Sequence, residues 1–298
     1  MTNPQPERTV PILLTPIRIK ALTTIQEMEN IVELEKQIWG YGTPGSDDPY
    51  PARAMFAMVE SGGLVAGAFL KEELVAFAVA WLGSETGTRR PYLHSQLLGV
   101  LPSHRSCGIG YHLKLFQRDY ALANNLELVK WTYDPLLSAN AYLNLHKLGA
   151  VIKKYVPNYY GNMQSCFTQG IASDRVWVSW YVKSFRVQER IKGSLSCDIS
   201  KLRCVSLVEK EPVSGLERLV GFDIQINEPR FLFEIPCDFT PFRMQKPKLA
   251  REWQEKIRSL FLHHLNRCCF VSDFFFKDGR AFYLIDCASL DKILNPVT

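Results

Sequence analysis

Hydrophobic and polar residues along the first half of the chain follow two periods, that of helices and that of strands. Residues 25–38 repeat apolar positions at helical spacing, with Thr24 and Glu27 placed as a capping box and Gly40 as a stop. Alternating strands and helices favour a mixed α/β sheet. The pattern predicts strands at residues 17–22, 64–70, 74–82, 97–101, 126–133 and 151–156, and helices at residues 24–40, 52–60, 109–123 and 138–148.

The second half is also structured, although its pattern is less regular. An amphipathic helix is expected after Pro247, and the apolar runs on either side of Asp278 and Gly279 predict a closing hairpin. Further strands are expected at residues 176–182, 203–208, 218–226 and 231–235. We therefore expect a flexible tail at residues 1–16, a first domain at residues 17–183 and a C-terminal α+β region at residues 184–298.

A loop with two glycines joins a predicted strand to a predicted helix. The apolar residues 97–101 lead through Pro102 into Arg105-Ser106-Cys107-Gly108-Ile109-Gly110, and helical periodicity follows. The first N–H groups of a helix have no partner within it and lie at the positive end of its dipole. Glycine lets the backbone approach a ligand closely. The loop therefore predicts an anion site, most naturally for phosphate.

Composition and charge limit the partners of the chain. Its 298 residues are 47% hydrophobic and 22% charged, enough to build a substantial core. The net charge of +5 is spread without a dense basic block, which gives nucleic-acid binding no support. No apolar run has the length of a membrane span, and residues 1–14 lack a signal-peptide pattern. Eight scattered cysteines without a C-x-x-C pair are typical of free thiols, so we expect a cytoplasmic protein with no membrane anchor.

The loop and its flanks together resemble a known family. The string GVLPSHRSCGIGYHLKLFQRDYA resembles the acyl-CoA binding motif of the GNAT acyltransferases, and DPLLSANAYLNLHKLGA is similar to the next motif of that family. YVPNYYG, FLFEIPCDF, LAREWQ and the closing hairpin extend the likeness to a bacterial subgroup with an extra C-terminal half, some of whose members are N-acyltransferases, including succinyltransferases, acting on amino acids. The resemblance implies a GNAT fold, an α/β (α+β) class with a mixed central sheet flanked by helices, plus a C-terminal α+β extension.

The resemblance also implies acetyl-CoA or another acyl-CoA as co-substrate. Backbone N–H groups of the loop would surround the coenzyme A pyrophosphate, and backbone groups of the preceding strand would hold the pantetheine arm. For the glycines, the alternative is a surface turn that serves only helix entry. The expected cofactor-binding residues are Leu98, Val100, Arg105, Ser106, Cys107, Gly108, Ile109, Gly110 and Asn140.

Candidates for the two proton transfers of an acyl transfer are fewer. His94 enters the site on the strand before the loop and, with Asp134 at the end of the next strand, is the candidate base. Many GNAT enzymes place a Tyr four residues before the Gly that ends the next motif, but Leu145 stands there in this chain. Tyr142 or His146 is the candidate acid in its place, and departure of the thiolate without an acid is the alternative, because the pKa of a thiol is not far above neutral. A buried, hydrogen-bonded role for His94 and packing roles for Tyr142 and His146 are the alternatives.

The expected function is therefore an N-acyltransferase that moves an acyl group from acyl-CoA to the amine of a small molecule, an amino acid or related metabolite. The alternative is an acyl-CoA binding or regulatory module without turnover, which the missing Tyr at Leu145 favours. A homodimer is compatible with either. A polar aromatic turn is the candidate acceptor pocket, with an ordinary β-turn as its alternative. It consists of Tyr155, Asn158, Tyr159 and Tyr160.

A second group of residues could suggest a zinc site: His263, His264, Cys268 and Cys269. The group lacks two well-spaced ligand pairs, so we expect no metal.

Overall fold

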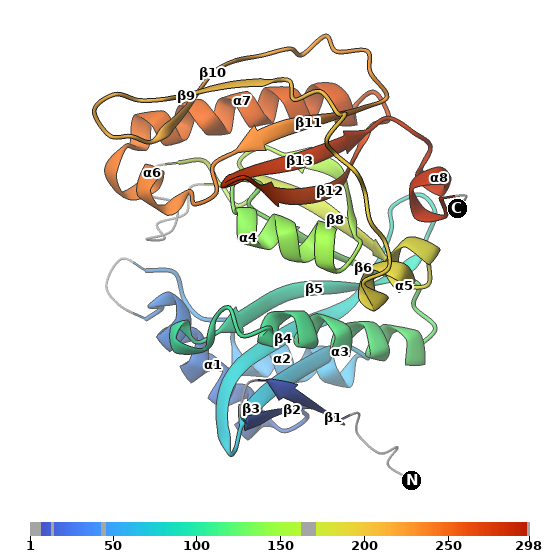
Figure 1. Ribbon diagram of the computed structural model, residues 1–298. Coiled ribbons are helices and arrows are strands. Elements are labelled where there is room, and N and C mark those ends of the chain that lie inside the picture. Colours follow the sequence, from blue (N-terminus) through green and yellow to red (C-terminus); the bar gives the residue numbers. More distant parts are fainter. Residues whose placement is uncertain (1–6, 13–14, 43–45, 162–170, 297–298) are drawn as a thin grey trace. The chain divides into compact units, whose positions relative to one another are not determined.

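A computed structural model describes residues 7–12, 15–42, 46–161 and 171–296 of the chain. The chain divides into two compact units, Met1–Trp131 and Thr132–Thr298, which are described separately below (Figure 1). This division falls elsewhere than the boundary expected from the sequence, and the domain limits 17–183 and 184–298 remain a prediction. Within the described ranges, no helix combines the length and the apolar composition that crossing a membrane requires.

The first unit is built around a sheet with strand order β1-β2-β3-β4-β5-β6. Neighbouring strands are antiparallel as far as β5, and β5 runs parallel to β6. The elements are β1 (Glu7–Ile12), β2 (Thr15–Ala21), α1 (Ile25–Trp39), α2 (Ala52–Glu60), β3 (Leu64–Leu70), β4 (Glu73–Ser84), β5 (Pro91–Val100), the 3-10 helix η1 (Pro102–His104), α3 (Ile109–Ala123) and β6 (Leu128–Tyr133), whose last two residues enter the second unit.

Most of this unit follows the sequence pattern, and one expectation is wrong. Residues 7–12, expected within a flexible tail, form the edge strand β1, in which Arg8 pairs with Ile19 of β2. The capping box of α1 is present: the N–H of Glu27 donates to Thr24 Oγ1, and the Glu27 carboxylate accepts from the Thr24 N–H. The proline content of this segment indicated a loop. An edge strand nevertheless tolerates proline, because the missing N–H group is not needed for pairing on the outer side.

Helices cover both faces of this sheet (Figure 1). On one face, α1 and α2 pack on a core cluster that includes Phe77 and Val79 of β4. Ser95 of β5 is oriented to the other face, where its hydroxyl meets a side chain of α3. Because successive strand residues alternate between faces, β5 presents different side chains to the two helical layers.

The second unit has a sheet of strand order β8-β7-β12-β13-β11, with all neighbours antiparallel, and a separate hairpin of β9 and β10. Its elements are α4 (Ser138–Ala141), the π-helix η2 (Tyr142–Lys147), β7 (Val151–Val156), β8 (Arg175–Tyr181), α5 (Phe185–Lys192), β9 (Ser206–Lys210), β10 (Glu217–Phe222), β11 (Arg230–Ile235), α6 (Thr240–Gln245), α7 (Pro247–Leu265), β12 (Phe270–Lys277), β13 (Arg280–Asp286) and α8 (Leu290–Leu294).

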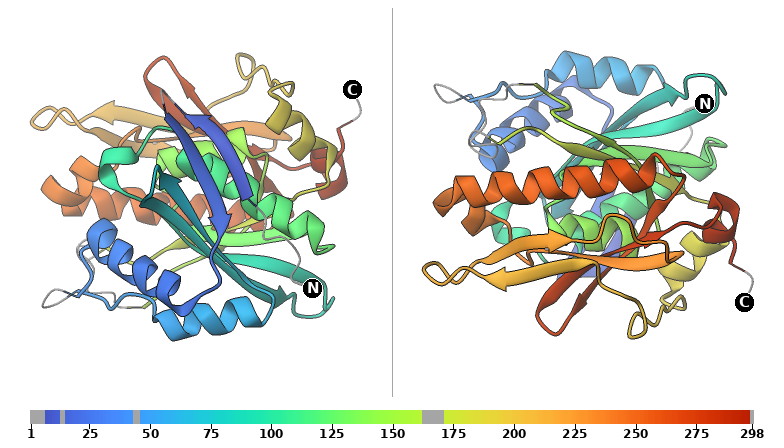
Figure 2. Two further views of the ribbon diagram at one scale, coloured as in Figure 1. Left: turned by 90° about the horizontal axis from the view of Figure 1, so that it is seen from below. Right: turned by 90° about the horizontal axis from the view of Figure 1, so that it is seen from above.

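The long helix expected after Pro247 is present as α7, and it packs against this sheet with a buried apolar face (Figure 2). Its Phe261 ring lies 5.2 Å from the ring of Tyr283 in β13 and 6.0 Å from that of Tyr155 in β7. The helix expected at residues 138–148 differs from an α-helix, because the N–H of Leu148 donates to the carbonyl of Leu143, five residues back.

A disulfide in this unit corrects the expectation that every cysteine is a free thiol. Cys269 and Cys287 form a bridge and lie next to the paired residues Phe270 of β12 and Asp286 of β13. Sequence spacing did not indicate the pair, because only the β12–β13 register places these cysteines opposite each other. Cys166 lies outside the described residues, and the remaining cysteines are free: Cys107, Cys197, Cys204, Cys237 and Cys268.

Candidate functional site

The loop between β5 and α3 contains two residues with a left-handed backbone conformation. Ser106 and Gly108 both lie in the left-handed region, at φ 63° and 83°. Gly108 is the N-cap of α3 and offers no side chain to its first N–H groups. Both residues are exposed to solvent. Left-handed residues next to a helix N-terminus are a feature of backbone loops that can bind an anion such as phosphate.

Side chains of the loop are engaged locally and leave its outer backbone accessible. Arg105 Nε donates to the carbonyl of Val100, 3.2 Å away, and Cys107 Sγ donates to the carbonyl of Arg105 at 3.4 Å. The Cβ of a residue replacing Gly110 would meet Leu98 Cδ2 at an ordinary 3.5 Å, whereas one replacing Gly108 would be strained by φ alone. Packing within the chain therefore does not require Gly110.

Strand β5 separates from β6 next to this loop. Its register with β6 consists of Leu93 with Val129 and His94 with Lys130, while its pairing with β4 continues as far as Val100. The β4 pairing also contains a bulge, because Leu97 pairs with Val79 and Ser95 with Ala80, which leaves Gln96 as the extra residue. Among the described residues of this unit, the last part of β5 therefore pairs with β4 alone.

His94 lies on the α1–α2 face of β5 and is 7% exposed. Its Nε2 lies 3.0 Å from Gln96 Oε1, and its ring stacks on Trp81 with centroids 4.8 Å apart. Trp81 stacks in turn on Tyr50, at 6.4 Å. Burial lowers the pKa of His94, although the hydrogen bond with Gln96 opposes this change. The imidazole is therefore neutral near pH 7 and chemically able to accept a proton.

Glu35 of α1 is a buried carboxyl that the sequence analysis missed. It is 1% exposed, and its Oε2 accepts a hydrogen bond of 2.9 Å from the N–H of Tyr50. Among the described residues its Oε1 has no hydrogen-bond partner. Burial raises the pKa of this carboxyl to about 7. A signal was available, because Glu35 falls on the apolar stripe of α1 between Ile31 and Ile38.

Lys114 of α3 is a second buried ionisable residue that sequence reasoning missed. Its Nζ donates to Ser95 Oγ at 2.8 Å and lies 3.8 Å from the ring centroid of Trp131. Burial lowers the pKa of its ammonium group to about 7. Lys114 contacts β5 on the α3 side of the sheet, whereas His94 lies on the α1–α2 side.

The remaining predicted residues belong to the second unit. Both oxygens of Asp134 are engaged: one accepts from the Leu136 N–H at 2.9 Å and the other pairs with Arg243. Asn140 is exposed on α4. Tyr142 stacks on His146, with ring centroids 4.7 Å apart.

Two further candidates of this unit have structural partners. His146 Nδ1 lies 3.1 Å from the buried Asp273, so this alternative acid belongs to an ion-pair network. In the proposed acceptor turn, the Tyr155 hydroxyl donates to Asp174, whose carboxylate also pairs with Arg258. Tyr160 remains 43% exposed. Within the unit, Tyr160 is therefore the more accessible of these aromatic side chains.

Comparison with known proteins identifies the first part of the chain. Residues 28–149 match the model of the acetyltransferase (GNAT) family. The motifs of the sequence predicted this similarity, and the mixed α/β architecture with a mostly antiparallel sheet fits it. A search of curated proteins gave no match.

Solved structures of acetyltransferases match part of the chain at low similarity. The chain is 14% identical to the ribosomal-protein-S18-alanine N-acetyltransferase of Escherichia coli, with a TM-score of 0.44 over 56% of this chain and 94% of that one. A putative acetyltransferase from Salmonella typhimurium, solved with acetyl-CoA, is 15% identical, with a TM-score of 0.44 over 56% and 94%. A GNAT-family acetyltransferase from Streptococcus pneumoniae is 13% identical, with a TM-score of 0.43 over 55% and 97%. Because these values are low, the assignment rests on the family match.

Proposed function

We propose that this chain is an N-acyltransferase that moves an acyl group from acyl-CoA to the amine of a small molecule, such as an amino acid or a related metabolite. The observation that carries this proposal is the left-handed pair Ser106 and Gly108 at the start of α3, within a GNAT-family domain. Acetyl-CoA or a larger thioester such as succinyl-CoA would be the donor. The co-substrate would supply an activated carbonyl and a thiol leaving group.

In this proposal, the first unit binds and orients both reactants. Backbone N–H groups from Arg105 to Gly110 hold the pyrophosphate, and the free edge of β5 at Leu98 and Val100 holds the pantetheine arm. The same edge offers hydrogen bonds to the thioester oxygen, which stabilise negative charge as the amine attacks. Asn140 completes the proposed cofactor contacts. Direct attack in a ternary complex needs no covalent enzyme intermediate, so Cys107 has no nucleophilic role.

Proton transfer is assigned to His94 first. A neutral imidazole accepts the proton that the attacking amine must lose, and its stacking on Trp81 fixes the ring plane. The aromatic rings of Trp81 and Tyr50 suit a cationic amine before deprotonation. Tyr142 stays the proposed donor to the leaving thiolate. Asp134, with both oxygens engaged, would act by orienting its arginine partner.

A thiol-release assay over a panel of acyl-CoAs and amines tests this function. The chain should release coenzyme A only when a suitable amine is present, and His94→Ala should lower kcat/KM by about 10²–10⁴-fold, the usual contribution of a general base. Saturable coenzyme A binding without release for any amine would instead support the binding or regulatory module. The observation that favours this second function is Leu145, which is fully buried where the family commonly has a Tyr.

The placement of the cofactor loop has its own test. Gly108→Glu should abolish coenzyme A binding in calorimetry, because the side chain brings negative charge into the phosphate nest. Gly87→Glu is the matched control, since Gly87 also has a positive φ of 94° and open space around its Cβ position. Coenzyme A binding that survives Gly108→Glu would refute the placement.

We also propose a cytoplasmic location, where Cys269 and Cys287 would meet reducing conditions.

A further inference from the structure

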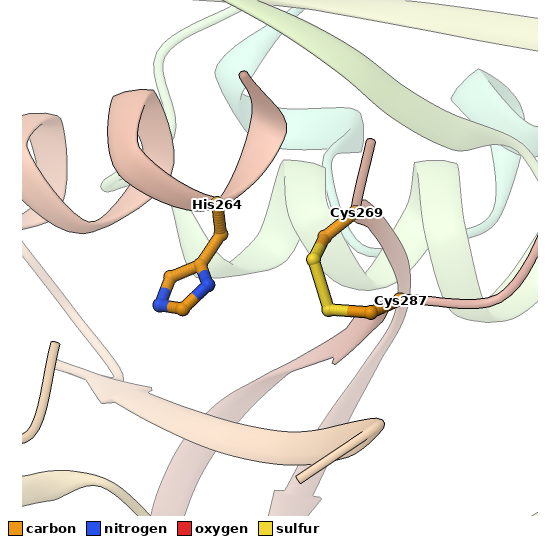
Figure 3. Close-up of side chains that lie close together, drawn as sticks. All are labelled: His264, Cys269 and Cys287. Carbon is orange, nitrogen blue, oxygen red and sulfur yellow. A yellow bond between two sulfur atoms is a disulfide. The ribbon is translucent and has the colours of Figure 1, made fainter. Parts of the chain in front are cut away.

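The disulfide of the second unit has a buried histidine beside it. Figure 3 shows the imidazole of His264 next to the bridge between Cys269 and Cys287, with one ring nitrogen on the side of the sulfurs. One ligand atom from each of these three residues lies within 4.8 Å of the other two. His264 and Cys269 are 4% and 5% exposed, whereas Cys287 is exposed. The group is thus buried on two sides and open to solvent on the third.

We propose that His264, Cys269 and Cys287 form a binding site for a thiophilic divalent cation such as Zn²⁺, and that the disulfide is the closed, metal-free form of this site. Two thiolates and one neutral imidazole are a donor set that zinc accepts, with water in the fourth position. The exposed side at Cys287 leaves room for that water. The sequence pattern grouped His264 and Cys269 with His263 and Cys268, because Cys287 becomes a neighbour only through the β12–β13 register.

The geometry fits a tetrahedral site after the bridge opens. With zinc–sulfur and zinc–nitrogen distances of about 2.3 and 2.0 Å, ligand atoms lie about 3.5–3.8 Å apart. The imidazole nitrogen now lies at most 4.8 Å from the sulfurs, so it needs to move about 1 Å closer to them. The two sulfurs, which are joined in the disulfide, must separate. The frame around them is ordered, since the Cys269 N–H donates to the His264 carbonyl at 3.1 Å.

Opening and metal binding balance as two reactions. A dithiol reductant transfers two electrons and two protons to the bridge, which gives two thiols and the disulfide of the reductant. Zn²⁺ then replaces the two thiol protons, which are released to solvent, and binds the neutral imidazole. In the reverse direction, a small-molecule disulfide takes two electrons from the thiolates and two protons from solvent, is reduced to two thiols, and the bridge that forms releases the ion. The site thereby couples metal occupancy to the redox state of the surroundings.

Zinc titration of the full chain tests the proposal. The chain is reduced with a phosphine, the phosphine is removed without air, and Zn²⁺ is added alone while bound metal is counted by native mass spectrometry. The reduced chain should bind about one ion, the number that three protein ligands can hold, and the oxidised chain none. Co²⁺ in place of Zn²⁺ should give thiolate-to-metal absorbance, which reports sulfur ligands directly.

Two variants separate this site from other thiols. Cys287→Ser should raise the Kd for Zn²⁺ by at least about 100-fold, because loss of an outer partner alone costs up to that factor. The substitution falls on an exposed residue, so the chain should still fold, as circular dichroism can verify. Cys268→Ser, which changes an exposed neighbouring thiol, should leave the Kd unchanged. Absence of zinc uptake by the reduced chain, or equal Kd values for the two variants, would overturn the proposal.

Discussion

The conformation of Gly108 allows a quantitative test of the loop at the start of α3. Gly108 has φ 83° and ψ 0°, a conformation that costs an L-residue roughly 1–2 kcal/mol. Gly108→Ala should therefore lower the free energy of unfolding by about 1 kcal/mol, because part of the strain is offset by a less flexible unfolded chain. No steric clash adds to this value, since the nearest atom to the new Cβ is His112 Cδ2 at 4.0 Å.

Gly110→Ala is the matched substitution two residues further on. Gly110 is helical, and its new Cβ would make an ordinary contact of 3.5 Å with Leu98 Cδ2. Alanine is favoured over glycine in a helix by about 0.5–1 kcal/mol, so this variant should gain stability. The two variants should differ by about 2 kcal/mol, or about 1 M in the urea midpoint at an m-value of about 2 kcal/mol per M.

Urea unfolding followed by circular dichroism measures this difference, and coenzyme A titration of the same variants adds a functional readout. Gly110→Ala should retain coenzyme A binding, because the new methyl group makes only an ordinary contact with Leu98 and leaves the left-handed residue Gly108 unchanged. An equal or higher urea midpoint for Gly108→Ala than for Gly110→Ala would refute the left-handed N-cap, and with it the backbone geometry on which the proposed cofactor site depends.

Three further predictions concern buried ionisable groups and the disulfide. Because the pKa of Glu35 rises from 4.5 to about 7 on folding, the chain should lose up to about 3 kcal/mol of stability as pH increases across this interval. Urea midpoints should show that Glu35→Gln abolishes this loss of stability, whereas the exposed control Glu33→Gln retains it. The pKa of Lys114 falls from 10.5 to about 7, so stability should increase from pH 7 to 10.5, and a Lys114→Met variant with the same increase would contradict this assignment. Under oxidising conditions Cys287→Ser should lower the free energy of unfolding by about 3 kcal/mol in urea titrations, because the bridge closes a loop with a separation of 18 residues, whereas Cys268→Ser should have little effect.

Local patterns in the sequence predicted much of the first unit. The capping box at Thr24 and the glycine at residue 40 fixed the ends of α1, since both act through hydrogen bonds to nearby backbone groups. The strand, loop and helix around Gly108 were predicted for the same reason. Edge strand β1 and the π-helix η2 were not, because pairing with β2 and the register within a helix depend on residues outside a short window.

The surroundings of His94 and Glu35 depended more strongly on tertiary structure. Sequence placed His94 on the strand before the loop, but its stacking on Trp81 follows from the β4–β5 register with its bulge at Gln96. Only the structure shows that Glu35 is buried and that its carboxylate accepts a hydrogen bond from the N–H of Tyr50. Perturbed pKa values arise from desolvation, which is a property of the packed structure, so sequence spacing alone did not reveal them.

The sequence by itself thus determined the strand, loop and helix around Gly108 and the similarity to the GNAT family model, because glycines, helix entry and apolar periodicity act over a few neighbouring residues. Only the tertiary structure decided which distant side chains meet. Cys287 joins Cys269 and His264 through the pairing of β12 with β13, and Lys114 reaches Ser95 through the packing of α3 on β5. Such contacts depend on strand register and helix packing, which are set by the whole core and not by a local segment.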